Sequence, residues 1–411
     1  MTESLPSESA AQPDAPSGTI DPFVPLRRTG LDPLPELAAL RAETPVRKLE
    51  FPFGISAWLV SGYDQAKSVL GAHQEFSNDF ANVTTLTGGM ASAEQNPGGL
   101  GMADPPAHTR LRKMLTPEFT MRRLQRLTPR ITEIVDQLLD GMTSAGSPVD
   151  FVQAFAMPLP SLVICELLDV PYPDREAFGK LSGARFDIFG GAGTGLEAIS
   201  ESLQYMGELV KRQRAKPGDG LLGMLIRTYG DQIDDTELAG LADGVLIGGH
   251  ETTASMLALG AIALLSSPDR AETVRGGDAD AVHRAVEELL RYLTVVQVAF
   301  PRFARQDIEV AGQQIKAGEM VLVSLSGANR DPVLGEDLET LDLARVPTSH
   351  HAFGYGIHRC VGSELARMEL RIAYPALLQR FPTLRLDKPL SEISFREYSV
   401  VFGVEDLPVA W

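Results

Sequence analysis

Apolar residues recur three and four positions apart along most of the chain, a spacing that places them on one face of a helix. The pattern predicts helices over residues 35–42, 64–70, 124–142, 152–168, 173–189, 196–214, 234–266, 282–293 and 362–380. Alternating apolar and polar residues predict strands over 46–60, with a turn at Pro52-Phe53-Gly54, and over 298–323, where we expect the main sheet. The chain should therefore be mostly α-helical, with a smaller β region.

The helix predicted over 234–266 is the longest. Asp234 and Glu237 have the spacing of a capping box, which marks its start. About 33 residues would span about 50 Å, enough to cross the whole molecule. Gly248 and Gly249 fall in its middle, although each costs about 1 kcal/mol relative to alanine. Close approach of a ligand to the helix backbone would explain that cost.

Composition limits the class of protein. The formal net charge of −17 over 411 residues argues against general binding of nucleic acids or anionic membranes. The two cysteines, Cys165 and Cys360, lie far apart and suit a reducing cytosol. Residues 1–25 are rich in Ser, Pro and acid without the features of a signal peptide, so we expect a disordered tail. No linker divides residues 26–411, which we expect to form a single cytoplasmic domain without a membrane anchor.

Residues 353–362, Phe-Gly-Tyr-Gly-Ile-His-Arg-Cys-Val-Gly, form the most informative stretch. They should be a loop that ends where a helix begins, so amide groups and the helix dipole should stabilise a thiolate at Cys360. Gly354 and Gly356 allow backbone conformations closed to other residues and leave space for a flat ligand. A thiolate on a rigid loop beside such a space suits an axial haem ligand.

Other roles for Cys360 have less support. A lone cysteine is most often a small buried apolar residue, as Cys165 should be. A zinc site would need several Cys or His ligands at short spacing, and His358 alone does not supply them. A catalytic Cys–His pair is conceivable, but residues two positions apart in a loop seldom point at one substrate.

This stretch resembles the cysteine-loop signature of cytochrome P-450 enzymes, with the aromatic residue, glycines, histidine, cysteine and final glycine in step. The resemblance extends over about residues 25–411 and is to soluble bacterial members of the family. It implies the cytochrome P-450 fold, a triangular prism of helices with haem b between the long central helix and the helix after the cysteine loop. Residues 78–106, in that case, cover the substrate pocket; the alternative is a mobile surface loop.

The resemblance also implies roles for particular residues. His108 and Arg112 share a helix face and can bind one anion together, although such a pair alone is often a solvated surface. In the family, the haem propionates are bound by the residues that match His108, Arg112, Arg302 and His358. The full set of implied cofactor contacts is His108, Arg112, Arg302, His358, Cys360, Gly248, Gly249, Phe353 and Gly354, with Cys360 as the iron ligand.

Glu251 and Thr252 match the acid–alcohol pair of the family's oxygen-binding groove, where the threonine hydroxyl can bond the carbonyl four residues earlier. Glu288 and Arg291 match the Glu-x-x-Arg motif, and Arg345 matches the third member of that buried structural network. The predicted substrate-lining residues are Gly244, Val245, Gly248, Val295, Val296, Ala299, Phe300 and Val401, together with the 80–100 loop.

The resemblance implies a haem-thiolate monooxygenase that hydroxylates or epoxidises an apolar polyketide, macrolide, terpenoid or steroid-like molecule of specialised metabolism. O₂ is the cosubstrate, and electrons come from NAD(P)H through a ferredoxin and its reductase. A local basic site for the acidic ferredoxin is expected at Arg110, Lys113, Arg122, Arg123, Arg359 and Arg367. A haem-thiolate peroxygenase or rearrangement enzyme and a haem-based gas sensor are the alternatives; neither needs the acid–alcohol pair.

Overall fold

The computed structural model describes residues 20–79, 81–82, 99–175, 178 and 192–411. Thirteen of its helices carry the label α: α1 Pro35–Glu43, α2 Tyr63–Gly71, α4 Ala107–Leu115, α5 Met121–Leu124, α6 Thr128–Ala145, α7 Pro158–Leu168, α9 Ala192–Ala215, α10 Leu221–Tyr229, α11 Asp235–Leu265, α12 Pro268–Arg275, α13 Ala279–Leu293, α14 Leu325–Ala328 and α15 Ser363–Arg380. A short π-helix, Val152–Ala156, precedes α7. The predicted helices therefore agree with the structure wherever it describes the chain, apart from their ends.

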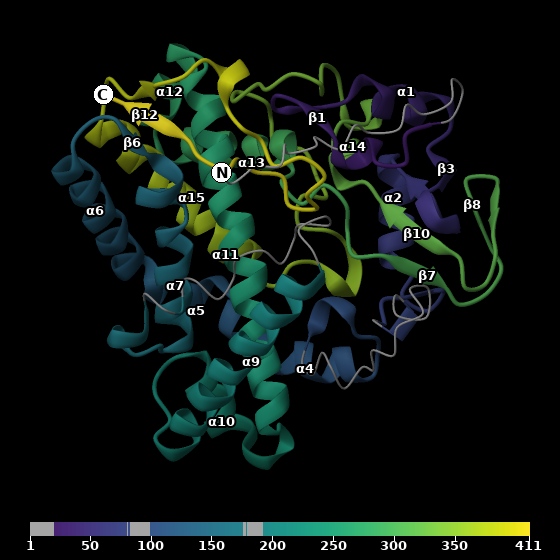
Figure 1. The fold of residues 1–411 in the computed structure, drawn as a ribbon, viewed down its shortest axis with the longest axis horizontal. Coiled ribbons are helices and arrows are strands. Elements are labelled where there is room, and N and C mark those ends of the chain that lie inside the picture. Colours follow the sequence, from purple (N-terminus) through teal and green to yellow (C-terminus); the bar gives the residue numbers. More distant parts are fainter. Residues whose placement is uncertain (1–19, 80, 83–98, 176–177, 179–191) are drawn as a thin grey trace, which may run out of the picture.

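The long central helix α11 begins where the sequence predicts. The Asp234 carboxylate accepts a hydrogen bond from the Glu237 backbone N–H, and the Glu237 side chain accepts one from the Asp234 N–H. Figure 1 shows α11 crossing the molecule, with α1 and α2 on one side of it and α6, α7 and α15 on the other. Within the described residues α11 is the one helix long and apolar enough to span a membrane, and 72% of its most apolar stretch is buried inside the protein.

The main sheet has five strands in the order β3-β4-β10-β7-β5. These are β3 Val46–Glu50, β4 Ser56–Val60, β5 Phe76–Ser77, β7 Arg302–Ala304 and β10 Met320–Val323. β10 pairs in parallel with β4 and antiparallel with β7. The hairpin expected over 46–60 is thus confirmed, with a 3₁₀ turn at Pro52–Gly54.

The prediction that 298–323 forms the main sheet is only partly right. β7 and β10 belong to it, but β8 Ile308–Val310 and β9 Gln313–Ile315 pair with each other in a separate hairpin. Its turn has positive φ angles at Ala311 and Gly312. Two smaller sheets pair β1 Arg28–Thr29 with β2 Asp32–Pro33, and β11 Arg385–Leu386 with β12 Pro408–Ala410 and β6 Val149–Asp150.

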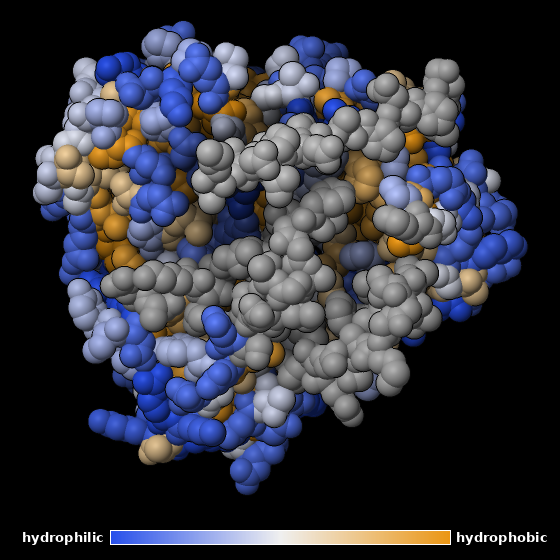
Figure 2. Space-filling model, viewed as in Figure 1, coloured by the Kyte–Doolittle hydropathy of each residue, from blue (hydrophilic) through white to orange (hydrophobic). Residues whose placement is uncertain are grey.

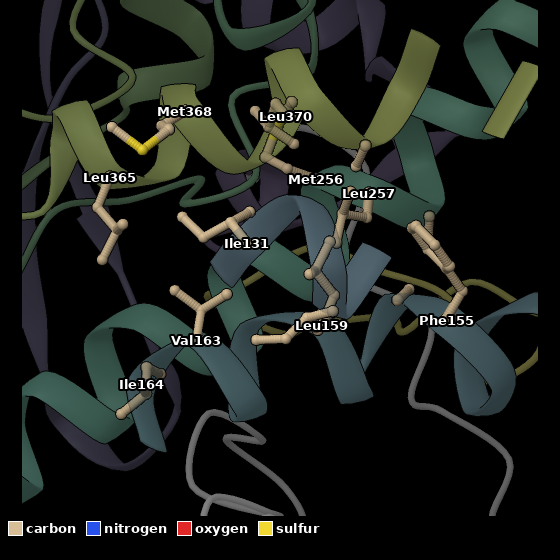
Figure 3. Packing of buried hydrophobic residues seen from close by; sticks show 14 of the residues in the cluster. Ile131, Phe155, Leu159, Val163, Ile164, Met256, Leu257, Leu365, Met368 and Leu370 are labelled. Atoms are coloured by element: carbon tan, nitrogen blue, oxygen red, sulfur yellow. The ribbon is translucent and has the colours of Figure 1, made fainter. Parts of the chain in front are cut away.

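Buried apolar residues of four helices form the main core. Ile131 of α6, Leu159 and Val163 of α7, Met256 of α11 and Met368 of α15 meet there (Figure 3). Each such side chain contributes about 1.5–3 kcal/mol when fully buried. The rim of the face seen in Figure 2 is mostly hydrophilic, and apolar residues show further in. The core therefore packs α11 against both α7 and α15.

The described residues begin before the predicted domain boundary. Val24–Leu26 form a buried 3₁₀ turn that packs near Leu37, so ordered contacts start at or before Val24. The helix predicted over 173–189 lies largely outside the described residues. Because α9 starts at Ala192, Gly193 and Gly195 belong to a helix and not to a loop before it.

Candidate haem-thiolate site

One strip of α11 is open although most of the helix is buried. Gly244, Gly248 and Thr252, spaced four residues apart, are not buried, whereas residues 253–264 all are. A Cβ atom placed on Gly244 or Gly248 would meet no other atom within 4 Å. Thr252 Oγ1 donates to the Gly248 carbonyl at 2.7 Å, which confirms the predicted bond. The core helix therefore has an open strip with a hydroxyl at its end.

The second glycine has a different environment. A Cβ on Gly249 would lie 3.1 Å from Ile164 Cδ1, so the missing side chain lets α7 pack closely against α11. That packing is reason enough for a glycine, and a cofactor contact by Gly249 stays a prediction. The neighbouring His250 ring donates to the Met157 carbonyl at 2.9 Å, so it is a hydrogen-bonded polar group inside the core.

Backbone hydrogen bonds fix the cysteine loop. The Cys360 N–H donates to the Phe353 carbonyl at 2.9 Å, and the Gly354 N–H donates to the His351 carbonyl at 2.8 Å. Gly354 and Gly356 have φ angles of +69° and +74°, as the sequence predicts for a strained loop. A Cβ on Gly356 would clash with the backbone of α2. Cys360 thus lies at a fixed place just before α15.

The electrostatics of the thiol differ from the prediction. Burial raises the pKa of Cys360 above its ordinary value, more than the Gly362 N–H and the charges of Arg112, Arg359 and Arg367 lower it. The helix N-terminus alone therefore does not make Cys360 a thiolate. Bonding of the sulfur to a metal cation would, because coordination deprotonates a thiol.

His108, His358 and Arg302 come together from three segments. The rings of His108 and His358 lie 4.2 Å apart between centroids. Both ring nitrogens of the buried His108 lack a hydrogen-bond partner among the described residues. His358 Nδ1 donates to the Leu100 carbonyl at 3.2 Å, and burial, helped by the charge of Arg302, lowers the pKa of His358 to about 3.

Arg302 is a buried cation in the same cluster. Nη1 donates to the Phe300 carbonyl at 2.9 Å, and the residues described show no ion pair for this guanidinium. Burial lowers its pKa to about 10. Arg112 lies nearby at the cysteine loop, where Nη2 donates to the Arg359 carbonyl at 2.6 Å. Unpartnered buried donors beside a buried cation fit the carboxylates of haem propionates.

Glu251 has a partner that the sequence did not reveal. Its carboxylate forms an ion pair with Arg396, 145 residues further along the chain. Arg396 Nη2 also donates to Ser255 Oγ at 2.7 Å. The one signal in the sequence was that an acid inside an apolar helix needs a counterion.

The predicted structural network is confirmed. Arg291 donates to both Glu288 carboxylate oxygens at 2.8 Å, and Arg345 Nε donates to Glu288 Oε1 at 3.1 Å. Arg291 also donates to the backbone carbonyls of Asn329 and Leu338. These buried charges are paired and hydrogen-bonded, so they join α13 to the segment before the cysteine loop.

The predicted pocket residues fall into two groups. Val296 pairs with Val401 in an isolated β-bridge, and the Phe402 N–H donates to the Val295 carbonyl, so these residues form one wall; Ala299 follows close by. Phe300 is 47% exposed, and a Cβ on Gly101 would lie 2.6 Å from its ring. Its ring therefore lies against Gly101, and the assignment of Phe300 to the pocket stays a prediction. Gly244 and Val245 belong to the α11 strip, and most of the 80–100 loop lies outside the described residues.

The predicted basic site is smaller than expected. Arg367 is buried and pairs with Glu287 through two hydrogen bonds of 2.7 and 2.9 Å, so its assignment to this surface was wrong. Arg110 pairs with Glu237, and Arg123 pairs with Glu118. The remaining exposed cations of the set are Lys113, Arg122 and Arg359.

A cysteine loop before a helix, unpartnered donors for carboxylates and an open strip on the core helix together define a haem-thiolate protein. The family model for cytochrome P450 matches residues 51–170 and 280–392. The chain belongs to the cytochrome P450 family. It is a monooxygenase of the bacterial type, with haem and O₂ as cofactor and cosubstrate.

Relatives match over nearly their whole length. Cytochrome P450 FAS1 of Rhodococcoides fascians is 40% identical over 96% of this chain and 100% of its own. Cytochrome P450 monooxygenase PikC of Streptomyces venezuelae is 42% identical over 92% of this chain and 91% of its own. The structure of P450 StaH from biosynthesis of the glycopeptide antibiotic A47934 has a TM-score of 0.85, with 40% identity over 94% of this chain and 99% of its own.

Proposed function

We propose that this monooxygenase hydroxylates or epoxidises a medium-to-large apolar molecule of specialised metabolism, such as a polyketide, macrolide, terpenoid or steroid-like compound. The observation that carries the proposal is the Thr252 hydroxyl on the open strip of α11, held 2.7 Å from the Gly248 carbonyl and adjacent in sequence to Glu251. A relative named for antibiotic biosynthesis supports the substrate class. When bound, the haem supplies O₂ activation, and a thiolate ligand favours O–O cleavage.

Cys360 is the proposed metal ligand. The loop holds its backbone by the hydrogen bond to Phe353, and Gly354 has open space where a Cβ would be. His108, Arg302 and His358, with Arg112 at the edge of the cluster, hold the propionates. Both ring nitrogens of His108 are buried without a hydrogen-bond partner in the described structure, and a carboxylate would accept from its N–H.

Glu251 and Thr252 supply and position protons. The hydroxyl of Thr252 donates to a backbone carbonyl, so its oxygen lone pairs are left to accept a hydrogen bond on the open side. Glu251 directly precedes Thr252 in sequence, and its carboxylate can exchange protons with that hydroxyl through water. Substrate lies along Gly244 and Val245 and against the wall that includes Val296 and Val401.

Electrons reach the site from NAD(P)H through a ferredoxin and its reductase. Lys113, Arg122 and Arg359 are exposed cations beside the cysteine loop and α4–α5, on a chain whose formal net charge is −17. A local basic site of this kind attracts an acidic ferredoxin and orients it. The protein works in the cytoplasm, where such carriers occur.

Turnover assays separate this function from its alternatives. Compounds are first screened for a low-to-high-spin shift of the haem spectrum. The best ligand is then incubated with NADH, ferredoxin and reductase, or with hydrogen peroxide alone. We expect an oxygenated product in the first reaction. Product in the second reaction alone would indicate a peroxygenase. An isomerised product would indicate a rearrangement enzyme, and ligand binding without any product would indicate a gas sensor.

A further inference from the structure

Arg396 attaches to α11 at two points one helical turn apart. Nη1 pairs with the Glu251 carboxylate, and Nη2 donates to Ser255 Oγ at 2.7 Å. The Glu251 side chain is 10% exposed and that of Arg396 24%, so water screens the pair only weakly. A planar guanidinium with two fixed partners restricts both the place and the orientation of the carboxylate.

Gly403 provides the room for this guanidinium. A Cβ on Gly403 would clash with Nη2 of Arg396 and would lie 2.8 Å from both Arg396 Cζ and Ser255 Oγ. Gly403 does not have a left-handed backbone conformation, so its φ angle does not explain the glycine. The missing side chain is therefore explained by the approach of Arg396 to α11.

The same segment contacts the predicted substrate wall. The Arg396 N–H donates to the Gly403 carbonyl at 2.9 Å, which closes a hairpin over residues 394–405. Within this hairpin Val401 pairs with Val296. The hairpin therefore touches α11 through Arg396 and the pocket wall through Val401.

Burial of an ion pair is not needed for the packing of α11. The pair is costly to desolvate, and apolar residues such as Leu257 and Leu259 already fill the interior face of the helix. We propose that Arg396 is a positioning residue that holds the Glu251 carboxylate for proton supply, with Gly403 leaving space for its guanidinium. This inference rests on the role proposed above for Glu251.

Gly403→Ala is the sharpest test, because it displaces the guanidinium and leaves Glu251, Thr252 and Arg396 unchanged. Arg396→Gln removes the positive charge, and Arg396→Lys keeps it. Lys388→Gln, which breaks an exposed pair with Asp406, is the matched control in the same C-terminal region. 7-Ethoxycoumarin is the probe substrate, and its dealkylation is followed by fluorescence.

Two oxidants separate proton supply from folding. With O₂, NADH, ferredoxin and reductase, protons must come through the protein, whereas hydrogen peroxide brings its own. We expect Gly403→Ala and Arg396→Gln to lower the rate of NADH-driven product formation about tenfold, part of the factor that a positioned proton donor contributes. The peroxide-driven rate should stay within about twofold of wild type, and Arg396→Lys, which keeps the charge but not the two-point contact, should recover only part of the loss. Equal losses with both oxidants, or none with NADH, would overturn the proposal.

A second readout does not depend on activity. Thermal unfolding of Arg396→Gln, Glu251→Gln and the double variant should show a midpoint shift for the double variant that is smaller than the sum of the single shifts. Additive shifts would show that the two residues do not interact and would overturn the inference. If the haem-loaded wild type oxidises the probe with neither oxidant, while the variants show non-additive shifts, the result would contradict the proposed function and not the contact between Arg396 and Glu251.

Discussion

The rings of His108 and His358 lie 4.2 Å apart between centroids, at an interplanar angle of 43°. His108 belongs to α4 and His358 to the cysteine loop, 250 positions further along the chain. The backbone carbonyl of Leu100 accepts a hydrogen bond from the His358 ring. Burial lowers the pKa of both histidines, so both rings are neutral at pH 7. A neutral His108 ring keeps one N–H that can donate to an anion without repelling Arg302, whereas the N–H of the neutral His358 ring already donates to Leu100.

Replacement of His108 and Arg302 by alanine should therefore weaken haem retention. Each lost hydrogen bond to a charged propionate is worth about 1.5–3 kcal/mol, so the double variant should release haem about 100-fold faster or more. Transfer of haem to an excess of an apoglobin scavenger measures the rate. The exposed Arg122→Ala serves as control and should not change it. An unchanged rate in the double variant would rule out these residues as propionate ligands.

Cys360→Ser should abolish the thiolate spectrum of the reduced, CO-bound protein, whereas Cys165→Ser should keep it. Cys165 lies inside α7 and is fully buried in the apolar core, where burial raises the pKa of its thiol to about 12, so a haem has no access to it. The absorption spectrum after reduction under CO is the measurement. Loss of the thiolate band in Cys165→Ser and not in Cys360→Ser would contradict the assignment.

Glu369 of α15 should make the protein less stable as pH rises. Burial raises the pKa of this carboxyl to about 8, and Oε2 has no hydrogen-bond partner among the described residues. Between the unfolded value of 4.5 and about 8, the folded state holds a proton that the unfolded state loses. The free energy of unfolding therefore falls by up to about 1.4 kcal/mol per pH unit in that window.

Glu369→Gln should remove this slope, because the amide does not titrate. Denaturant unfolding of the wild type and the variant at pH 5 and pH 8 gives the comparison. The variant should gain most at pH 8 and little at pH 5. An equal difference at both pH values would mean that Glu369 ionises in the folded protein as it does in water.

The features predicted well are those that depend on neighbours in sequence. The capping box of Asp234 and Glu237, the bond from Thr252 to Gly248 and the pair of Glu288 with Arg291 each join residues no more than four positions apart. A helix brings such residues together whatever the rest of the fold does. The cysteine loop is similarly local, because its bonds join residues within one short stretch.

The features that were missed depend on distant segments. Arg396 reaches Glu251 across 145 residues, and Arg367 reaches Glu287 across 80. Composition made Arg367 look like a surface cation, but a partner on α13 lets it be buried. Gly249 looked like a second ligand contact, and its closeness to Ile164 gives it a packing reason that spacing along the chain cannot show.

The smaller basic site leads to a kinetic prediction. Lys113→Gln with Arg122→Gln should slow electron transfer from a reduced ferredoxin at low ionic strength and have little effect at 0.5 M salt, because salt screens exposed charges. Stopped-flow reduction of the haem under CO measures the rate. Arg27→Gln, at an exposed arginine well before α4 and α5 in the sequence, is the control. The same loss at both salt concentrations would indicate a folding defect and not a docking role.

Removal of the Thr252 hydroxyl should separate oxygen use from product formation. The proposed substrate contacts lie mainly along Gly244, Val245 and the segment that includes Val401, so Thr252→Ala should keep the spin shift that substrate induces. Proton positioning should fail instead, and electrons from NADH should then leave as hydrogen peroxide. Glu251→Gln should slow the whole reaction, because proton supply limits it. Product, NADH and peroxide are assayed together, with Thr253→Ser as a control one position further along α11. Full coupling in Thr252→Ala would mean that another group supplies the proton and that the acid–alcohol pair is misassigned.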